Sequence, residues 1–345
     1  MPLFHQAVIH CGGPKTGSTN LQRRLNAGRD LLAMREILAY PPGVWHAPLG
    51  SLFCEKPEDY IYNRLSGRDD RRSMLLADRE YLTQLESWIL LQKPAGSLVI
   101  SYEGFCDLEE VALRRMRAWA LRQASLVVAI FYCRGPLDYA SSAIGQQAQF
   151  GIPRGSCPPP VVPYREYIRR LQRVFGGDSL QIRPFRRGEG GWDVLADFFG
   201  SIGVAEHEAA WLDRQIQGVL VNRRVSAAAV AVAEGIIAEL GNRDVTMTAH
   251  HFFWTFGRHL HRIDGPPLRL KPQEIEQVLN QAEPHTTCLE NLCGIRFCEQ
   301  TGDFQEVVSA ERLAAEEAAE AVGRRAATAY VESLGCRESA CLPDV

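Results

Sequence analysis

The residues best suited to chemistry lie together near the start of the chain, in the segment GGPKTGST at positions 12–19. An apolar run at residues 7–11 precedes this segment and reads as a short strand, and a helical pattern begins at Leu21. The free N–H groups of a helix N-terminus and the positive end of its dipole both favour a bound anion. Lys15 adds a full positive charge, and hydroxyl donors come from Thr16, Ser18 and Thr19. Strand, tight loop and helix in this order predict an anion-binding loop.

The order of residues in this loop differs from the nucleoside-triphosphate loop G-x-x-x-x-G-K-[ST]. In that motif a hydroxyl directly after the lysine holds magnesium. Here Lys15 precedes the last glycine, Gly17, in the order Pro-Lys-Thr-Gly-Ser-Thr. This order resembles the 5′-phosphosulfate-binding loop of sulfotransferases that use 3′-phosphoadenosine 5′-phosphosulfate (PAPS). A Gly-rich turn that binds nothing is the alternative interpretation, and the lysine, the hydroxyl groups and the flanking elements together favour the anion site.

A second candidate anion contact follows the most apolar run of the chain, residues 126–132. Arg134 comes at the end of that run, and Pro136 starts a helix, where its missing N–H costs nothing. An arginine fork and a nearby hydroxyl would hold a second phosphate. The spacing of Arg134 and Ser142 resembles the 3′-phosphate motif of the same sulfotransferases, an arginine followed by a serine eight positions on. Two phosphate sites for one adenosine nucleotide distinguish PAPS from ATP.

The resemblance covers roughly the first 205 residues, and the two nucleotide motifs are its specific parts. It implies a sulfotransferase with a P-loop-like fold and PAPS as co-substrate. The residues that would bind PAPS on this basis are Pro14, Lys15, Thr16, Gly17, Ser18, Thr19, Arg134 and Ser142.

Sulfuryl transfer should follow the logic of phosphoryl transfer, an in-line displacement with charge stabilisation. Lys15 would neutralise the charge that develops on the leaving oxygen. Glu103, which directly follows the apolar run 97–102, is the first candidate for the base that accepts the proton of the acceptor, and the resemblance supports this role. His46 is the rival base, and Glu103 would then cap a loop or pair with Arg134. No acid ends the run 126–132, so we expect no metal requirement.

The elements that must position these residues alternate along the chain. Strands are expected at residues 7–11, 36–40, 97–103, 126–132 and 179–185. Helices are expected at residues 21–32, 73–91, 109–124, 136–149, 164–175 and 192–202. Such alternation predicts an α/β fold with a parallel sheet flanked by helices, in which ligands bind beyond the carboxyl ends of the strands. The loop at 12–19, Glu103 and Arg134 should therefore converge.

After residue 205 the alternation ends, and helices are expected at residues 226–240, 251–263, 273–281 and 310–333. We therefore expect two domains, a PAPS-binding α/β core at 1–205 and a mainly helical extension at 206–345 packed on the core. Residues 41–72 read as an irregular, aromatic and arginine-rich loop, either a solvated surface or a wall for substrate recognition. Residues 150–163, rich in Gly and Pro, read as a mobile lid or a substrate-facing loop.

Bulk composition narrows the class of protein. The net charge of −3 gives no general attraction to nucleic acid or to an anionic membrane. We expect neither a secretory signal nor a membrane span, because the longest apolar run is far shorter than the ~20 residues that cross a bilayer. The ten cysteines are scattered, and the spacing of Cys288, Cys293 and Cys298 is not that of a zinc site. A cytoplasmic protein with reduced thiols follows.

The leading hypothesis is a PAPS-dependent sulfotransferase that acts on a hydroxyl or amine of a carbohydrate, lipid or small-molecule acceptor. A P-loop kinase that uses ATP and magnesium, and a nucleotide-binding scaffold without catalysis, are the alternatives. The alanine-rich face of the last helix suggests a packing surface or a homodimer contact.

Overall fold

The structure, a computed structural model, describes residues 2–43, 45–92, 96–186, 192–216, 224–306 and 309–339. The chain forms two compact units, which are described separately. The first comprises Met1–Gly135, Val162–Val221 and Pro284–Phe297, and the second comprises Pro136–Val161, Asn222–Glu283 and Cys298–Val345. These units do not coincide with the expected boundary at residue 205, because the segment 136–161 belongs to the second unit.

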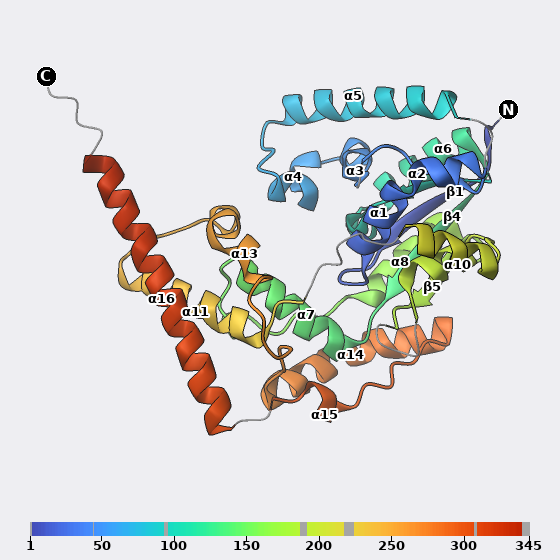
Figure 1. The fold of residues 1–345 in the computed structure, drawn as a ribbon. Helices are drawn as coiled ribbons and strands as arrows, with labels where there is room; N and C mark the ends of the chain where they lie inside the picture. The colour runs from blue at the N-terminus through green and yellow to red at the C-terminus, as the bar shows by residue number, and fades with distance from the viewer. Residues whose placement is uncertain are drawn as a thin grey trace, which may run out of the picture. The chain divides into compact units, whose positions relative to one another are not determined.

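The first unit is built on a five-stranded parallel sheet in the order β2-β3-β1-β4-β5 (Figure 1). The strands are β1 Phe4–Gly12, β2 Leu38–Ala39, β3 Ser97–Ser101, β4 Ala124–Cys133 and β5 Leu180–Pro184. All five residues of β3 and the last six of β1 are buried, as expected for strands covered on both faces. The predicted α/β fold with a parallel sheet is confirmed.

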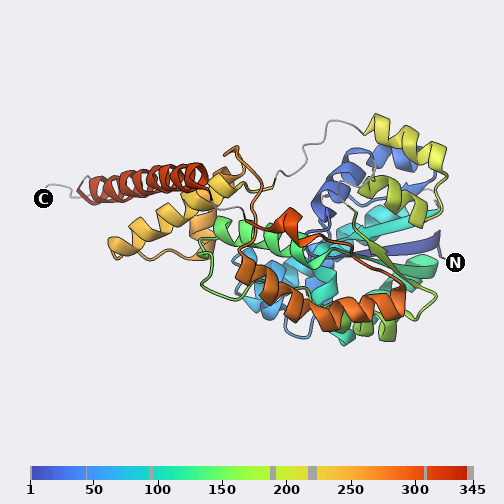
Figure 2. The same cartoon turned by 90° about the horizontal axis from the view of Figure 1, so that it is seen from below.

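Helices cover both faces of this sheet (Figure 2). They are α1 Ser18–Ala27, α2 Arg29–Met34, α3 Ala47–Phe53, α4 Ile61–Leu65, α5 Arg71–Leu90, α6 Glu110–Gln123, α8 Tyr164–Phe175, α9 Val194–Ser201 and α10 Glu206–Gln215. On one face α1, α2, α9 and α10 pack on apolar residues of the strands, with Leu21, Leu25 and Phe198 fully buried. On the other face α6 and α8 contact β4, and α3 contacts α6.

The structure corrects three local expectations in this unit. The helix expected at 21–32 is two helices, because it breaks at Gly28, where a Cβ would lie 2.4 Å from the Cδ1 atom of Ile216. The strand expected at 36–40 shrinks to the two residues of β2. The loop expected at 41–72 contains α3, α4 and a 3-10 turn at Pro57–Asp59. Such short helices are stabilised by burial rather than by their own propensity, so their periodicity is hard to read.

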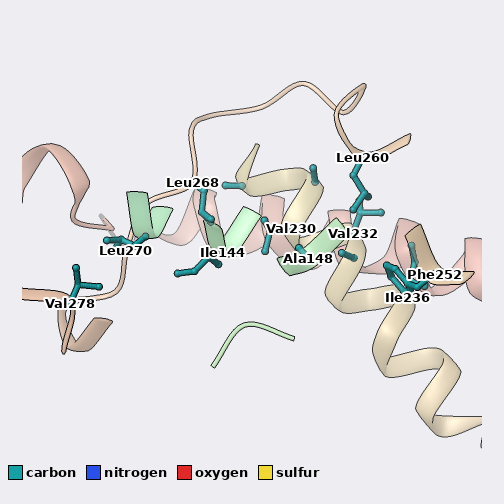
Figure 3. Packing of buried hydrophobic residues seen from close by; sticks show 14 of the residues in the cluster. Ile144, Ala148, Val230, Val232, Ile236, Phe252, Leu260, Leu268, Leu270 and Val278 are labelled. Carbon is teal, nitrogen blue, oxygen red and sulfur yellow. The ribbon is translucent and has the colours of Figure 1, made fainter. Parts of the chain in front are cut away.

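The second unit is helical. It contains α7 Pro136–Gln149, α11 Ala227–Asn242, α12 Ala249–Phe252, a π-helical turn at Phe253–Gly257, α13 Arg258–Leu260, α15 Thr301–Phe304 and α16 Ala310–Ser339. The helix α14 Pro272–Cys293 begins in this unit and is longer than the expected 273–281. Its core joins Ile144 and Ala148 of α7 to Val230 and Ile236 of α11 (Figure 3). None of the helices in the described ranges is long and apolar enough to cross a membrane.

The irregular segment 150–163 is fixed to the second unit by Arg154. The guanidinium group of Arg154 donates to both carboxylate oxygens of Glu274 at 2.9 and 2.7 Å, and its side chain is only 8% exposed. A second carboxylate, that of Glu306, lies 3.4 Å away. A bidentate, shielded ion pair of this kind orders the segment, which argues against a freely moving lid.

Close crossing of α11 and α16 in the second unit gives a test of the fold. A Cβ at Gly235 would lie 2.1 Å from the carbonyl oxygen of Glu320, and one at Gly323 would lie 2.0 Å from that of Val232. We expect Gly235→Ala to lower the free energy of unfolding by about 1–3 kcal/mol, because the two backbones must separate. This would occur although alanine favours a helix over glycine by about 1 kcal/mol.

The matched control is Gly241→Ala on the same helix, where a Cβ meets no atom within 4 Å. We expect this variant to be neutral or more stable than the wild type. Urea unfolding of the full chain measures both variants. Equal midpoints for Gly235→Ala and Gly241→Ala would contradict the close crossing.

Candidate anion-binding site

The loop after β1 lies directly against the ends of the neighbouring strands. Gly12 has a φ of +65°, and a Cβ there would lie 2.5 Å from the Cα atom of Glu103, just after β3. A Cβ at Gly13 would lie 1.9 Å from the carbonyl oxygen of Tyr132 in β4. Only glycine permits either approach. Lys15 also adopts a positive φ of 64°, a conformation that strains a residue with a side chain and is often found at functional sites.

The start of α1 has the features of an anion site. Gly17, with a φ of 78°, is the residue before the helix and supplies no side chain to cap the first turn. The hydroxyl of Ser18 is buried and has no hydrogen-bond partner among the described residues. Buried hydroxyl groups nearly always have a partner, so this one points to a ligand. Thr16 differs, because its hydroxyl donates to the carbonyl oxygen of Gly13 at 2.6 Å and so supports the loop itself.

Arg134, which follows β4, clamps this loop. Its guanidinium Nη1 donates to the carbonyl oxygen of Lys15, and its side chain and backbone together are 2% exposed. The hydroxyl of Tyr164 accepts from the Arg134 N–H at 2.7 Å and donates to the Arg134 carbonyl oxygen at 2.9 Å. The ring of Phe185 lies 5.5 Å from the guanidinium carbon. Arg134 therefore shapes the loop directly, a role that the sequence did not predict.

Opposite charges meet at the loop. Burial raises the pKa of Glu103, the charge of Lys15 opposes this rise, and Asp107 adds to it. Burial lowers the pKa of Lys15, Glu103 opposes this shift, and Arg134 adds to it. Lys15, Glu103 and Arg134 thus interact electrostatically, and their expected convergence is confirmed. A carboxyl group with a raised pKa, close to a cation, can act as a general base near neutral pH.

His46 lies fully buried beneath this site. Its Nδ1 accepts from the backbone N–H of Ser101 at 2.8 Å, and the backbone N–H of His46 donates to the Ser101 carbonyl oxygen at 3.2 Å. Burial lowers the pKa of His46 to about 4, with the carbonyl group of Pro41 opposing the shift. Because Nδ1 already accepts a hydrogen bond, this geometry favours a positioning role, and the base role of His46 stays a less favoured prediction.

The hydroxyl of Ser101 joins three elements below the loop. It lies 2.7 Å from Nδ1 of His10 in β1 and accepts from Nε2 of Gln22 in α1 at 3.0 Å. His10 and Ser101 are paired in register across β1 and β3. The sequence analysis missed this network, although two polar residues at the ends of otherwise apolar strands were a usable signal.

Ser142 lies in the second unit, on α7, and Arg134 lies in the first. Their joint contact with a 3′-phosphate therefore stays a prediction from the sequence. Within the second unit, the carboxylate of Glu299 accepts from the N–H groups of Leu137 at 3.0 Å and Asp138 at 2.9 Å. The first turn of α7 is thus capped by a carboxylate of the chain itself.

Over the described ranges, no group of three or more His, Cys, Asp or Glu side chains is placed to hold a metal ion. Cys288 and Cys293 are free thiols within the first unit, and Cys298 is a free thiol in the second.

Comparisons with known proteins give one distant match. No protein-family model matches the chain, and no curated protein does. Among solved structures the chain is similar to a sulfotransferase from Alicyclobacillus acidocaldarius, with 14% identity and a TM-score of 0.41. The match covers 86% of this chain and 97% of the other.

Removing the Ser101 hydroxyl should show how far the buried network supports the site. We expect Ser101→Ala to lower the free energy of unfolding by about 1–3 kcal/mol, because His10 and Gln22 would each lose a buried partner. Thr83→Ala is the control, since its exposed hydroxyl donates to the Arg79 carbonyl oxygen of the same helix. Urea unfolding measures both, and equal stability of the two variants would contradict the role of the network.

Proposed function

We propose that this protein is a sulfotransferase that moves a sulfuryl group from PAPS to a hydroxyl or amine of a small-molecule, carbohydrate or lipid acceptor. The observation that carries the proposal is the uncapped start of α1, where the buried Ser18 hydroxyl has no partner among the described residues, beside Lys15. The order Pro-Lys-Thr-Gly-Ser-Thr supports a phosphosulfate over a nucleoside triphosphate, because Lys15 precedes the last glycine, whereas the lysine of the magnesium-binding triphosphate loop directly follows it.

The residues of the loop then have three kinds of task in binding the 5′-phosphosulfate. The N–H groups at the start of α1 and the hydroxyls of Ser18 and Thr19 donate to its oxygens. Lys15 supplies the full charge. Pro14, Thr16 and Gly17 hold the backbone in the shape that aims these donors, and Arg134 fixes the loop from below through the Lys15 carbonyl.

The transfer itself is a displacement at sulfur. A bond forms between the acceptor oxygen and sulfur while the bond from sulfur to the bridging oxygen breaks, and that oxygen leaves with the electron pair on adenosine 3′,5′-bisphosphate. Glu103 accepts the proton from the acceptor, and Lys15 stabilises the negative charge on the leaving oxygen. The close approach of Gly12 to Glu103 holds the loop that carries Lys15 at the same end of the sheet as Glu103.

Ligand protection separates this proposal from its alternatives. We expect adenosine 3′,5′-bisphosphate to stabilise the protein by about 2.7 kcal/mol at a concentration 100 times its Kd, because only the folded state binds it. ATP with magnesium should give little protection. Thermal unfolding with each ligand measures the difference. Protection by ATP with magnesium alone would favour a P-loop kinase, and tight binding of the bisphosphate without any transfer would favour an inactive scaffold.

The base role of Glu103 predicts both a rate loss and a change in the pH profile. We expect Glu103→Gln to lower kcat/KM by about 10²–10⁴-fold, with the Kd of the bisphosphate nearly unchanged. Activity of the wild type should fall as pH drops through the pKa of Glu103, which burial raises above the ordinary 4.5. The variant should lack this acidic limb.

Glu109→Gln, at an exposed position of the same segment, is the control and should retain both the rate and the acidic limb. Steady-state kinetics between about pH 5 and 9, the range in which a general base titrates, measure the rate and the acidic limb of each variant. An acidic limb that survives in Glu103→Gln would transfer the base role to another group.

A further inference from the structure

A pocket of about 380 Å³ opens in the first unit, and its lining contains none of the loop residues 12–19. It is lined by Arg23, Trp45, Ala47, Pro48 and Tyr62. These residues come from α1, from the chain just before α3, from the first turn of α3 and from α4.

Three connections place this pocket beside the reacting groups. Arg23 follows Thr19 by one turn of α1, about 6 Å along the axis at 1.5 Å per residue, and helical side chains lean back toward the N-terminus. The ring of Tyr62 contacts that of Tyr102, the residue before Glu103, at 6.1 Å. Ala47 directly follows His46, which is hydrogen-bonded to the end of β3. The lining thus borders both the anion loop and the segment of the proposed base.

The Tyr62 side of the pocket is held in place by ring contacts and an ion pair. The Tyr62 ring lies 6.4 Å from the ring of Tyr60 and 5.4 Å from the guanidinium carbon of Arg68. Arg68 is fixed in turn by an ion pair of 2.8 Å with the fully buried side chain of Asp78. A wall that is ordered before binding loses less entropy when a ligand arrives. The Tyr62 ring is therefore suited to pack against the flat face of a bound ligand.

The side chains that line the pocket select a particular chemistry. Trp45, 52% exposed, presents an indole, and Tyr62, Ala47 and Pro48 add further apolar or aromatic surface. Such surfaces bind the flat faces of rings. Arg23 offers a planar guanidinium, which matches a carboxylate or another oxyanion. A volume of about 380 Å³ is near the lower end of ligand pockets, roughly 300–1,000 Å³, and so suits one or two rings.

We propose that this pocket binds the acceptor, a hydroxylated ring compound that carries an anionic group, with the ring against Trp45 and Tyr62 and the anion on Arg23. The proposal rests on the proposed sulfotransferase function and adds the substrate class of the same site. A sugar acid and an aromatic acid share this chemistry, and the experiment distinguishes them.

Direct binding tests the pocket without requiring transfer. The probes are two matched pairs, methyl β-glucuronide with its neutral amide, and 4-hydroxybenzoate with 4-hydroxybenzamide. We expect at least one acid to bind the wild type about tenfold more tightly than its amide, measured by isothermal calorimetry. The pair that shows the preference identifies the ring as a sugar or an arene. Equal binding of acid and amide in both pairs, or no binding of any probe, would overturn the proposal.

Variants assign the preference to single side chains. Arg23→Gln should abolish the preference for the acid, and Arg64→Gln, at an exposed position of α4 outside the pocket, should keep it. Trp45→Ala should weaken acid and amide by the same factor, and Trp45→Phe should restore both. If Arg23→Gln still bound the acid more tightly than the amide, the proposed contact between Arg23 and the anion would be wrong.

The two proposals can fail separately. Discrimination between acid and amide together with no binding of adenosine 3′,5′-bisphosphate would uphold the pocket and reject the sulfotransferase. Transfer from PAPS to the neutral amides as fast as to the acids, with no effect of Arg23→Gln on KM, would uphold the sulfotransferase and reject the substrate class.

Discussion

The close approach of two glycines to the neighbouring strand ends is the constraint on which the candidate site depends. Gly12 and Gly13 bring the loop after β1 so near to Glu103 and to the Tyr132 carbonyl that a single Cβ would displace it. Because the sheet is parallel and β1 lies between β3 and β4, groups that follow all three strands must meet at one edge. Contact at backbone distance, rather than long side chains reaching across a gap, therefore fixes where Lys15, Glu103 and Arg134 lie.

This packing creates an uncommon electrostatic environment. A lysine, a carboxyl group and an arginine share a buried space, in which burial lowers the pKa of Lys15 and raises that of Glu103. The charges of Lys15 and Glu103 oppose each other's shift, and Arg134 adds to the shift of Lys15. Arg134 also donates a hydrogen bond to the backbone carbonyl oxygen of Lys15, so Arg134 helps to fix the backbone from which the Lys15 side chain extends. Arg134 is therefore more than a candidate ligand-binding residue. Its removal would alter the shape of the loop as well as the charge at the site.

Below the loop, polar residues replace the apolar side chains expected in a sheet core. His10, Gln22 and His46 are each hydrogen-bonded to Ser101, which links β1, β3, α1 and the residue before α3. Buried polar groups of this kind specify one arrangement of the elements, because any shift leaves a donor or acceptor without a partner. The same arrangement brings Ala47, Tyr62 and Arg23 around one pocket, so the network that orders the loop also orders the surface proposed to recognise the acceptor.

The sequence by itself determined the alternation of strands and helices, the parallel sheet and the position of the glycine-rich loop 12–19, because periodicity and glycines are local features. It also placed Glu103 and Arg134 correctly, since the topology of a parallel sheet carries the ends of its strands to one edge. Only the tertiary structure decided that 41–72 contains helices, that α7 belongs to a second unit, and that His46 accepts a hydrogen bond from Ser101. These features depend on contacts between residues far apart in the chain, and no local pattern encodes which partners burial will bring together.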